Sequence, residues 1–381
     1  MNRFIAALAL ASILSSCGDG NPTSEGGTST VSSCTSVLVS GTADCSTSSS
    51  GTSGGSTATP APTTPEDPDV YATEMADNLT VDGMKYDKTT GKVVFDNVAF
   101  DGPDNTYILN AAKTAEFQKG GSTFGIYENE VGADPNTQFF AVFRRSPDEY
   151  SQVGALGTNR YATFGFGGAA AQRLNGDGSL PNAAEQFVFL GEYAAVRTIL
   201  ADDGSRPEIQ YVSGTTKIQV DIEDFNTVGA VEGVIVDRKF FDANGVQIFQ
   251  SRFTDGSGNT YDQDYIALKT AQINYDNWTI TSSDATLTMY NALDSGADIV
   301  TDPVTGEKTT SDRISDSETA SGTWEGLFTG PDGQEVTGIV FVEGTGPVGI
   351  DTINGTRTIL TQGQIREVGV FQAQEDPTQR K

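Results

Sequence analysis

Short runs of alternating apolar and polar residues follow one another along the chain beyond residue 69, separated by Gly, Asn and Asp. Residues 217–222 and 285–290 alternate as a strand with one buried face does. Comparable strand-like runs occupy 187–193, 278–281, 324–328, 336–342, 357–360 and 368–371. No long helical period lies between these runs, so the pattern predicts an all-β fold built as an antiparallel barrel or sandwich.

Two further runs, 231–241 and 246–253, are joined by Asp242-Ala243-Asn244-Gly245. The Asn-Gly pair favours the positive φ angles of a tight hairpin, so these runs predict a meander. Weak helical signals interrupt the first half of the chain at 110–117, with about two turns, and at 183–186, with about one turn.

The amino-terminal segment carries Arg3 and then an apolar run over 4–14. The run is too short for a permanent transmembrane helix and is typical of a signal peptide, here 1–16. Its end, Leu14-Ser15-Ser16-Cys17, resembles a bacterial lipobox. The resemblance implies a lipoprotein that is cleaved before Cys17 and carries a diacylglycerol, with palmitate as its acyl type, on that thiol. An ordinary secretory signal cleaved nearby is the alternative.

The stretch that follows Cys17 consists almost wholly of Ser, Thr, Gly, Pro and Ala. It lacks the apolar area that would offset chain entropy, so 17–69 is predicted to be a disordered tether. Gly18 stands where the inner-membrane retention aspartate of lipoproteins would be, which favours the outer membrane and the cell surface. Cys34 and Cys45 would pair as a disulfide in an oxidising compartment or stay free, and both alternatives remain open.

The chain carries 51 acidic against 23 basic residues, a net charge of −28. Nucleic acid would be repelled, so the expected partners are a membrane, through the lipid anchor, and an unknown protein or small-molecule ligand. Histidine is absent and no cysteine lies beyond Cys45, which excludes histidine- and thiolate-dependent catalysis and their metal sites from the folded part. No metal and no cofactor is expected.

Acidic turns at 175–178, 255–264 and 302–307 invite a calcium interpretation. The second begins like an EF-hand loop, but Ile266 occupies the position of the bidentate glutamate and strands, not helices, flank it. Plain hairpin turns are therefore expected at all three places.

One hairpin near the carboxyl end, 322–341, is rich in glycine. Its segment Gly330-Pro331-Asp332-Gly333 presets a turn, and the flanking glycines let strands bend or backbones approach closely, as a narrow barrel requires. The hairpin is similar to the one that marks the eight-stranded barrels of transferrin-binding protein B and its relatives. Its predicted structural residues are Trp324, Gly326, Phe328, Gly330, Pro331, Glu335 and Gly338; Thr329 and Thr337 depart from the family pattern.

A second stretch, 211–238, is similar to an earlier barrel hairpin of the same family, and Phe164-Gly165-Phe166-Gly167-Gly168 precedes the barrel as it does in the family's lipoproteins. The resemblance implies a β-rich handle-like subdomain at 70–184 and a C-terminal eight-stranded antiparallel β-barrel at 185–375. A polar tail, 376–381, would end the chain.

The same resemblance implies a cell-envelope binding protein of the transferrin-binding protein B and factor H-binding protein type, with iron or nutrient acquisition as one setting. No catalytic residues are then expected, and the protein would not be an enzyme. The alternative is a cell-envelope glycosidase or other hydrolase, which needs only two carboxylates. An enzyme predicts a cleft with two facing carboxylates and a raised pKa, whereas a binder predicts a filled barrel.

Replacing Cys17 by Ala removes the thiol that would carry the lipid, so the protein is expected to move from membranes to the soluble fraction. Membrane fractionation with acyl-chain labelling measures this. Cys45→Ala is the matched control and should leave the protein in membranes. Unchanged membrane association of the Cys17 variant would contradict the anchor.

Overall fold

The structure is a computed structural model that describes residues 68–101, 106–131, 137–161, 163–181, 186–201, 206–224, 228–254, 260–290, 299–301, 308–310, 316–353 and 357–380. The predicted signal peptide, the predicted tether and Cys17, Cys34 and Cys45 lie outside these residues, as does most of the predicted helix at 183–186. No helix in the described part is long and apolar enough to cross a membrane.

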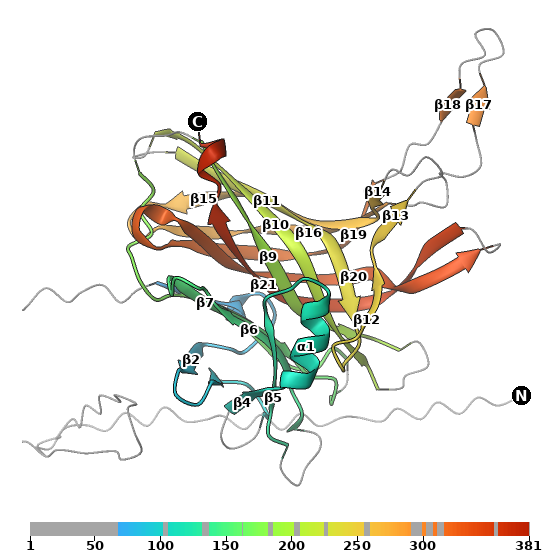
Figure 1. Ribbon diagram of the computed structural model, residues 1–381, viewed down its shortest axis with the longest axis horizontal. Helices are drawn as coiled ribbons and strands as arrows, with labels where there is room; N and C mark the ends of the chain where they lie inside the picture. Colours follow the sequence, from blue (N-terminus) through green and yellow to red (C-terminus); the bar gives the residue numbers. More distant parts are fainter. Residues whose placement is uncertain are drawn as a thin grey trace, which may run out of the picture. The chain divides into compact units, whose positions relative to one another are not determined.

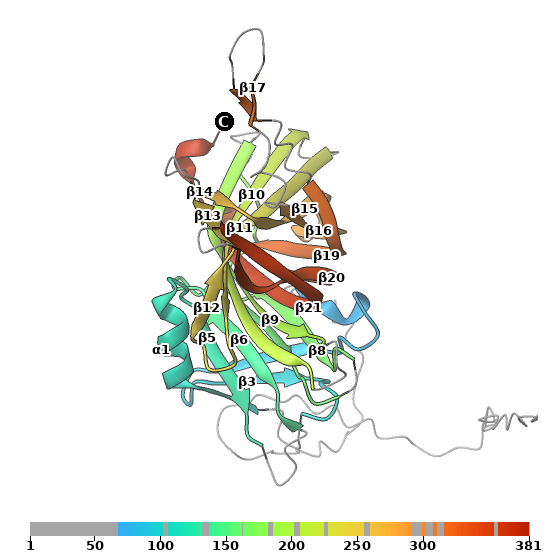
Figure 2. The same cartoon turned by 90° about the vertical axis from the view of Figure 1, so that its right-hand side faces the viewer.

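The amino-terminal part of the described chain forms one antiparallel sheet of eight strands, in the order β1-β8-β7-β6-β5-β4-β3-β2. Figures 1 and 2 show it against one side of the second sheet. The strands are β1 (Asp69–Tyr71), β2 (Gly83–Asp87), β3 (Lys92–Asp96), β4 (Thr106–Leu109), β5 (Gly125–Asn129), β6 (Phe140–Arg145), β7 (Ser151–Gly157) and β8 (Gly167–Arg173), and a short turn of helix, η1 (Ala72–Glu74), follows β1.

Strand β7 is buried along its whole length because both of its faces are covered. Val153 and Ala155 pack toward the second sheet, whereas Leu156 packs with Phe95 and Tyr107 into a separate core on the other face. Strand β7 therefore cannot show the simple alternation of a strand with one wet face, whereas β3 alternates between buried and half-buried residues.

The predicted helix at 110–117 is confirmed as α1 (Ala111–Lys119). Asn110 begins it as the N-cap, because its side-chain oxygen accepts a hydrogen bond from the backbone N–H of Lys113 at 3.2 Å. Phe117 is buried on the inner face of α1, with its ring 4.6 Å from that of Phe241 in the second sheet. The helix thus joins the two sheets at one edge (Figure 1).

Eight strands of the second sheet close into a barrel, because each pairs antiparallel with the next and the last pairs with the first. They are β9 (Gln186–Ile199), β10 (Glu208–Asp224), β11 (Val228–Phe241), β15 (Asp264–Asn274), β16 (Thr279–Tyr290), β19 (Asp316–Thr329), β20 (Glu335–Ile353) and β21 (Arg357–Glu375). This up-and-down closure removes the open edges of the sheet, and it confirms the predicted all-β class and barrel.

Five shorter strands lie in the connections between the described barrel strands. They are β12 (Gln247–Gln250), which pairs with β11, and two separate ladders, β13 (Arg252–Thr254) with β14 (Thr260–Asp262) and β17 (Ile299–Thr301) with β18 (Lys308–Thr310). The turn η4 (Pro331–Gly333) joins β19 to β20, and η5 (Pro377–Gln379) follows β21.

Several strand boundaries differ from the sequence prediction. The runs 278–281 and 285–290 lie at the two ends of the single strand β16, and 357–360 and 368–371 belong to the single strand β21. In β21 the polar residue Glu367 points into the barrel and is fully buried. The apolar pattern is therefore interrupted at this position, although the strand continues through it. The run 246–253 is divided at Ser251 between β12 and β13.

The turn between β11 and β12 is a hairpin, as predicted, but its geometry differs. Gly245 has a φ of 78°, whereas Asn244 keeps a negative φ. The Asp242 carboxylate instead accepts hydrogen bonds from the backbone N–H groups of Asn244 and Val246, at 2.8 and 2.9 Å. A side chain at position 245 would meet the Lys113 carbonyl of α1 at 2.4 Å, so glycine is required by the close packing of helix and hairpin.

The barrel interior is filled with apolar side chains. Trp324, Phe328 and Phe371 are buried there, and the indole N–H of Trp324 donates to the backbone oxygen of Lys269 at 2.9 Å. Trp278 is only partly buried against the same core. The large aromatic residues of the barrel therefore form its core, in agreement with the filled barrel expected of a binding protein.

A layer of charged residues crosses the apolar interior. Arg238 pairs with Asp264 and, at 2.5 Å, with Glu367; Arg197 lies 3.8 Å from the same Glu367 carboxylate. Tyr193 donates its hydroxyl hydrogen to Glu367 at 2.8 Å. All five side chains are fully buried, and two guanidinium groups face two carboxylates, so the layer can be neutral.

The ring of Phe240 lies beneath both guanidinium groups, at 4.7 Å from Arg197 and 5.0 Å from Arg238. Burial lowers the pKa of Arg197 to about 10, although the neighbouring Glu367 opposes this change. Desolvating four charges is costly, and their mutual attraction offsets the cost only while every partner is present. The layer therefore ties β9, β11, β15 and β21 into one arrangement.

Replacing Arg238 by Met leaves Asp264 and Glu367 without their nearest cation, and is expected to lower the free energy of unfolding by about 3–5 kcal/mol. Urea denaturation followed by tryptophan fluorescence measures this loss. Arg252→Met removes an exposed arginine that pairs with Asp237 and Asp262 and should cost less than about 1 kcal/mol. Equal, small losses in both variants would contradict the role given to the buried layer.

Candidate functional site

The glycine-rich hairpin identified in the sequence runs from the end of β19 to the start of β20. Trp324, Gly326 and Phe328 lie on β19; Gly330 and Pro331 belong to the connecting turn; Glu335 and Gly338 lie on β20. The structure thus brings all seven predicted residues into one hairpin.

Gly326 and Gly338 stand directly opposite each other in this hairpin. A Cβ atom on Gly326 would lie 2.5 Å from the Thr337 carbonyl, and one on Gly338 would lie 2.3 Å from the Glu325 carbonyl. Neither contact is possible for a real side chain, so the two strands approach at a distance that only glycine permits.

The turn of the hairpin does not face solvent alone. Gly330 has a φ of 78°, and its backbone N–H donates to the Asn175 carbonyl at 3.0 Å, while the Gly178 N–H donates to the Gly330 carbonyl at 3.2 Å. Arg173, at the end of β8, donates from Nε to the Phe328 carbonyl at 2.9 Å. The hairpin is therefore the place where the segment after β8 docks on the barrel.

The sequence predicted that Gly330 shapes the hairpin turn. It did not predict that Gly330 also binds the segment that follows β8. The expectation of a plain hairpin turn at 175–178 is wrong, because this turn connects β8 of the amino-terminal sheet to β9 of the barrel and is the partner of the glycine-rich hairpin. Gly176 has a φ of 78°, and a Cβ there would lie 2.2 Å from the carbonyl carbon of Gly330. Two glycine turns far apart in the sequence, each read as a local feature, thus make one backbone-to-backbone contact.

A second feature is an aromatic cluster in which the exposed Phe100 lies against the half-buried Tyr161 and Phe166. The three rings lie 5.2 to 5.5 Å apart, and Phe100 is 62% exposed. Phe100 also has a φ of 67°, in the left-handed region that bulky residues rarely adopt. Asn97 and Thr163 share this unusual backbone, with φ values of 64° and 58°.

The segment behind Phe100 is held firmly. The Asp101 carboxylate accepts a hydrogen bond from the Tyr107 hydroxyl at 3.3 Å, and Asn129 donates to the Asp101 carbonyl at 2.6 Å. Burial raises the pKa of Asp101 to about 6. Backbone strain persists only where surrounding contacts impose it, and strained positions gather at binding sites.

A basic residue, Arg160, adjoins the aromatic cluster in the sequence of a protein with a large acidic excess. Arg160 precedes Tyr161, and its Nε atom is buried without a hydrogen-bond partner in the described structure. Burial, followed by repulsion from Arg206, lowers the pKa of Arg160. Phe100, Tyr161, Phe166 and Arg160 are named here the aromatic patch. Phe166 belongs to the glycine-rich segment 164–168 identified in the sequence, whereas no motif marks Phe100, Arg160 or Tyr161.

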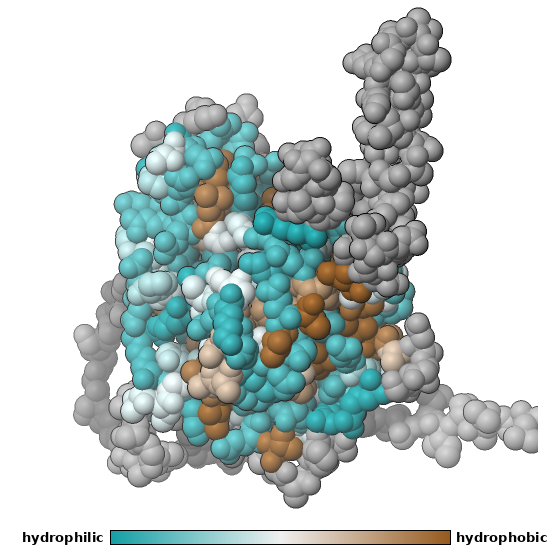
Figure 3. Space-filling view, turned by 45° about the vertical axis from the view of Figure 1, so that its right-hand side comes forward, coloured by the Kyte–Doolittle hydropathy of each residue, from teal (hydrophilic) through white to brown (hydrophobic). Residues whose placement is uncertain are grey.

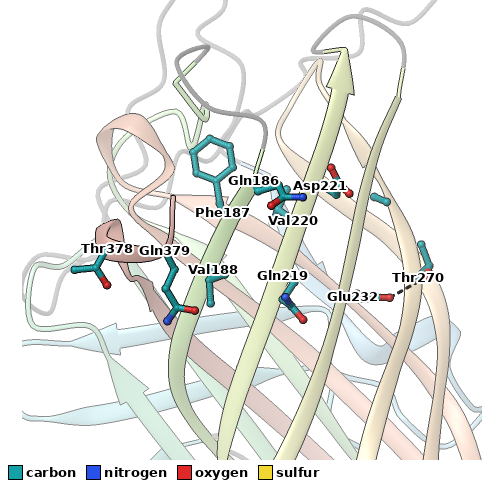
Figure 4. A pocket seen from close by; sticks show the side chains of 11 residues that line it. Gln186, Phe187, Val188, Gln219, Val220, Asp221, Glu232, Thr270, Thr378 and Gln379 are labelled. Carbon is teal, nitrogen blue, oxygen red and sulfur yellow. Dashed lines mark hydrogen bonds between the residues drawn. The ribbon is translucent and has the colours of Figure 1, made fainter. Parts of the chain in front are cut away.

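Two grooves mark the outside of the barrel. The first, of about 430 Å³, crosses β9, β10, β11 and β15 beside η5 and is drawn in Figure 4. Asp221 stands opposite Gln186 there, and Gln219 stands opposite Glu232. The second groove, of about 490 Å³, lies beside the turn η4 and is lined by Asp148, Tyr150, Pro181, Asp332, Gln334, Gln374, Glu375, Pro377 and Arg380.

The described carboxyl groups whose pKa is raised by burial lie away from both grooves. Burial raises the pKa of Glu325 to about 7 and of Asp101 to about 6, and it also raises the pKa of Asp264 and Glu335. All four lie in the barrel interior, between the sheets or behind the aromatic patch, and none lines a groove.

No group of three or more metal-ligating side chains of the kind that could hold an ion occurs in the described part of the chain. The acidic turn at 302–307 and residues 255–259 lie outside the described residues. On the face drawn in Figure 3, hydrophilic residues predominate around a group of apolar residues.

Comparisons with known proteins find no matching family model and no matching curated protein. Among solved structures, a double mutant of transferrin binding protein B from Haemophilus parasuis Hp5 is similar at 14% identity, with a TM-score of 0.30 over 78% of this chain and 45% of that one. A surface lipoprotein is similar at 14% identity, with a TM-score of 0.28 over 61% of this chain and 80% of that one.

A third similar structure is an intact transferrin binding protein B with N and C lobes, at 14% identity and a TM-score of 0.28. The match covers 68% of this chain and 39% of that one. The chain thus spans less than half of the first structures it matches. The closed barrel is established by this chain's own strand pairing.

Gly176→Ala should weaken the contact between the 175–178 turn and the hairpin. The left-handed backbone alone costs an alanine about 1–2 kcal/mol, and overpacking against Gly330 adds about 1–3 kcal/mol. Gly91→Ala is the control, because Gly91 has a φ of 70° but no atom near its Cβ position. Thermal unfolding with limited proteolysis compares them, and equal losses would contradict a docking role for Gly176.

Proposed function

We propose that this protein is a lipid-anchored cell-envelope binding protein whose aromatic patch contacts a macromolecular ligand. The exposed side chain of Phe100, held on a left-handed backbone, is the observation that carries the proposal. Aromatic and arginine side chains supply most of the binding energy in protein interfaces, and the patch combines both. A strained residue supported by buried hydrogen bonds is also preorganised, so less entropy is lost on binding.

Chemistry on a bound substrate is disfavoured by the same structure. The carboxyl groups with raised pKa among the described residues stand away from both grooves, where a glycosidase would need one. The barrel interior is filled and neutral, so it offers no chamber for substrate. We therefore propose a binding role and keep the carboxylate hydrolase as the alternative to be tested.

The charge of the protein narrows the ligand. A net charge of −28 repels nucleic acid and favours a partner with a basic surface. Arg160 would give the aromatic patch a local positive charge within that field. This distribution of charge fits a protein ligand with a basic surface. The part of that ligand that touches the aromatic patch would carry apolar and acidic groups.

The predicted lipid on Cys17 would hold the protein at the outer membrane, with the 17–69 segment as its tether to the cell surface. Acquisition of iron or another nutrient is the setting that the resemblance of the 322–341 hairpin suggests. Affinity capture from intact cells and their surroundings, followed by identification of the retained molecule, is the direct way to find the ligand.

Phe100→Ala should weaken binding of the captured ligand by about thirtyfold, because an interface hot spot contributes about 2 kcal/mol or more. Titration calorimetry gives the dissociation constants. Leu190→Ala is the matched control: Leu190 is an exposed apolar residue on β9, 42% exposed and outside the patch, and its loss should leave affinity unchanged. Unchanged affinity in the Phe100 variant, or cleavage of a polysaccharide without retention of any ligand, would contradict the proposal.

A further inference from the structure

Glu335 begins β20 and belongs to the glycine-rich hairpin, yet its side chain lies between the barrel and the amino-terminal sheet. It is 1% exposed, and the next residues on its side of the strand, Thr337 and Ile339, are also buried. Ile339 packs in the apolar core that the two sheets share. A carboxyl group thus lies at the start of a strand face that is buried and carries no other charged residue as far as Ile339.

Three hydrogen-bond donors converge on one oxygen of this carboxyl group. Oε1 of Glu335 accepts from the hydroxyl of Ser151 on β7, from the hydroxyl of Thr329 at 3.2 Å and from the side-chain amide of Gln372 at 3.5 Å. The same amide of Gln372 donates to the Ser151 hydroxyl at 2.5 Å. Ser151 belongs to the amino-terminal sheet and the other three residues to the barrel, so this cluster spans the contact between them.

The other oxygen, Oε2, is buried and has no hydrogen-bond partner. The amide oxygen of Gln372 is likewise buried and has none. An ionised carboxylate with a bare buried oxygen is strongly destabilising, whereas a protonated carboxyl carries a hydrogen on that oxygen and spreads no charge. The donors on Oε1 and the hydroxyl of Ser146 favour the ionised form, but burial of the carboxyl group between the two sheets opposes ionisation more strongly.

The cations around Glu335 are engaged elsewhere. Arg144 on β6 favours the ionised form, but it pairs with Glu192 on β9 at 3.4 Å and covers the Phe124 ring. Arg173 on β8 stands beside Ser151 and donates to the Phe328 carbonyl. At the end of β21, Glu375 pairs with Arg380 at 2.6 Å.

No ion pair to Glu335 is present in the described structure. Burial raises the pKa of Glu335, and the hydrogen bonds and Arg144 only partly oppose that rise. Complete burial without an ion pair therefore outweighs the donors that favour the ionised form.

We propose that Glu335 is protonated while the amino-terminal sheet is docked on the barrel. The contact between the sheet and the barrel is then pH-sensitive and weakens as the pH rises. The carboxyl would have an ordinary pKa, near 4.5, once the contact opens. The docked state therefore holds a proton that the open state releases. Its stabilising effect is complete below that ordinary pKa and is lost as the pH rises through the raised pKa of the docked state.

Glu335→Gln is the direct test, because glutamine has the shape of the protonated acid and cannot ionise. Hydrogen exchange in β7, β8 and the 175–178 turn, corrected for intrinsic exchange, is measured from pH 5 to pH 8. In the unaltered protein the opening equilibrium should grow by up to about tenfold per pH unit between the ordinary and the raised pKa. In Glu335→Gln it should lose this dependence and stay near the acid value.

Other buried carboxyl groups, such as Asp101 and Glu325, are present both in the unaltered protein and in Glu335→Gln. Their contribution to the pH dependence of opening is therefore the same in both proteins. Glu318→Gln, an exposed residue of β19 that pairs with Lys269, is the matched control and should keep the pH dependence. A Glu335 variant with the same pH dependence as the unaltered protein would overturn the proposal.

A glutamine variant that fails to fold would overturn it as well, because the site would then need the charge. Infrared spectroscopy gives a second readout. The unaltered protein at neutral pH should show a carbonyl band of a protonated carboxylic acid that Glu335→Gln lacks.

Discussion

Direct contact between the backbones of two glycine turns sets the relation between the two sheets. The turn that contains Gly176 meets the hairpin turn at Gly330, and hydrogen bonds through Asn175 and Gly178 fix the contact. Since no side chain fits between them, the strands on either side are brought close enough for small residues to pack. The apolar core between the sheets accordingly contains Ala194 and Val196 from the barrel, facing alanines and valines of β7 and β8. The contact between the two glycine turns therefore limits how far apart the two sheets can lie, and this spacing suits the small side chains buried between them.

The barrel supplies a rigid surface for this contact by a different means. Closure of eight strands leaves no free edge, and the buried layer around Arg238 and Glu367 links strands that the hairpins alone would not join. A charged layer of this kind contributes little net stability, because desolvation offsets attraction. Its value is specificity, since any shift in strand register would separate a buried charge from its partner.

Much of the fold was predictable from the chain. Alternating runs predicted the strands, the absence of helical periods predicted the class, and Asn110 with the following alanines predicted α1. The strand prediction failed where polar residues face the barrel interior. Glu367 interrupts the apolar pattern of β21, because its partners Arg197 and Arg238 lie on β9 and β11, more than a hundred residues away in the sequence.

The candidate site was less predictable than the fold. Gly330 and Glu335 were identified as hairpin residues, but their contacts with the 175–178 turn and with Ser151 depend on tertiary structure. Phe100 lacks any local signal, because exposure and a left-handed backbone cannot be read from residue type.

We propose that recognition takes place on the aromatic patch and not inside the barrel. Hydrogen exchange of the full protein, with and without the captured ligand, distinguishes these two locations. Binding should protect residues 97–101 and 158–166 and leave strands β10 and β15 unchanged. Protection confined to the barrel strands, with the aromatic patch exchanging as in the free protein, would contradict it.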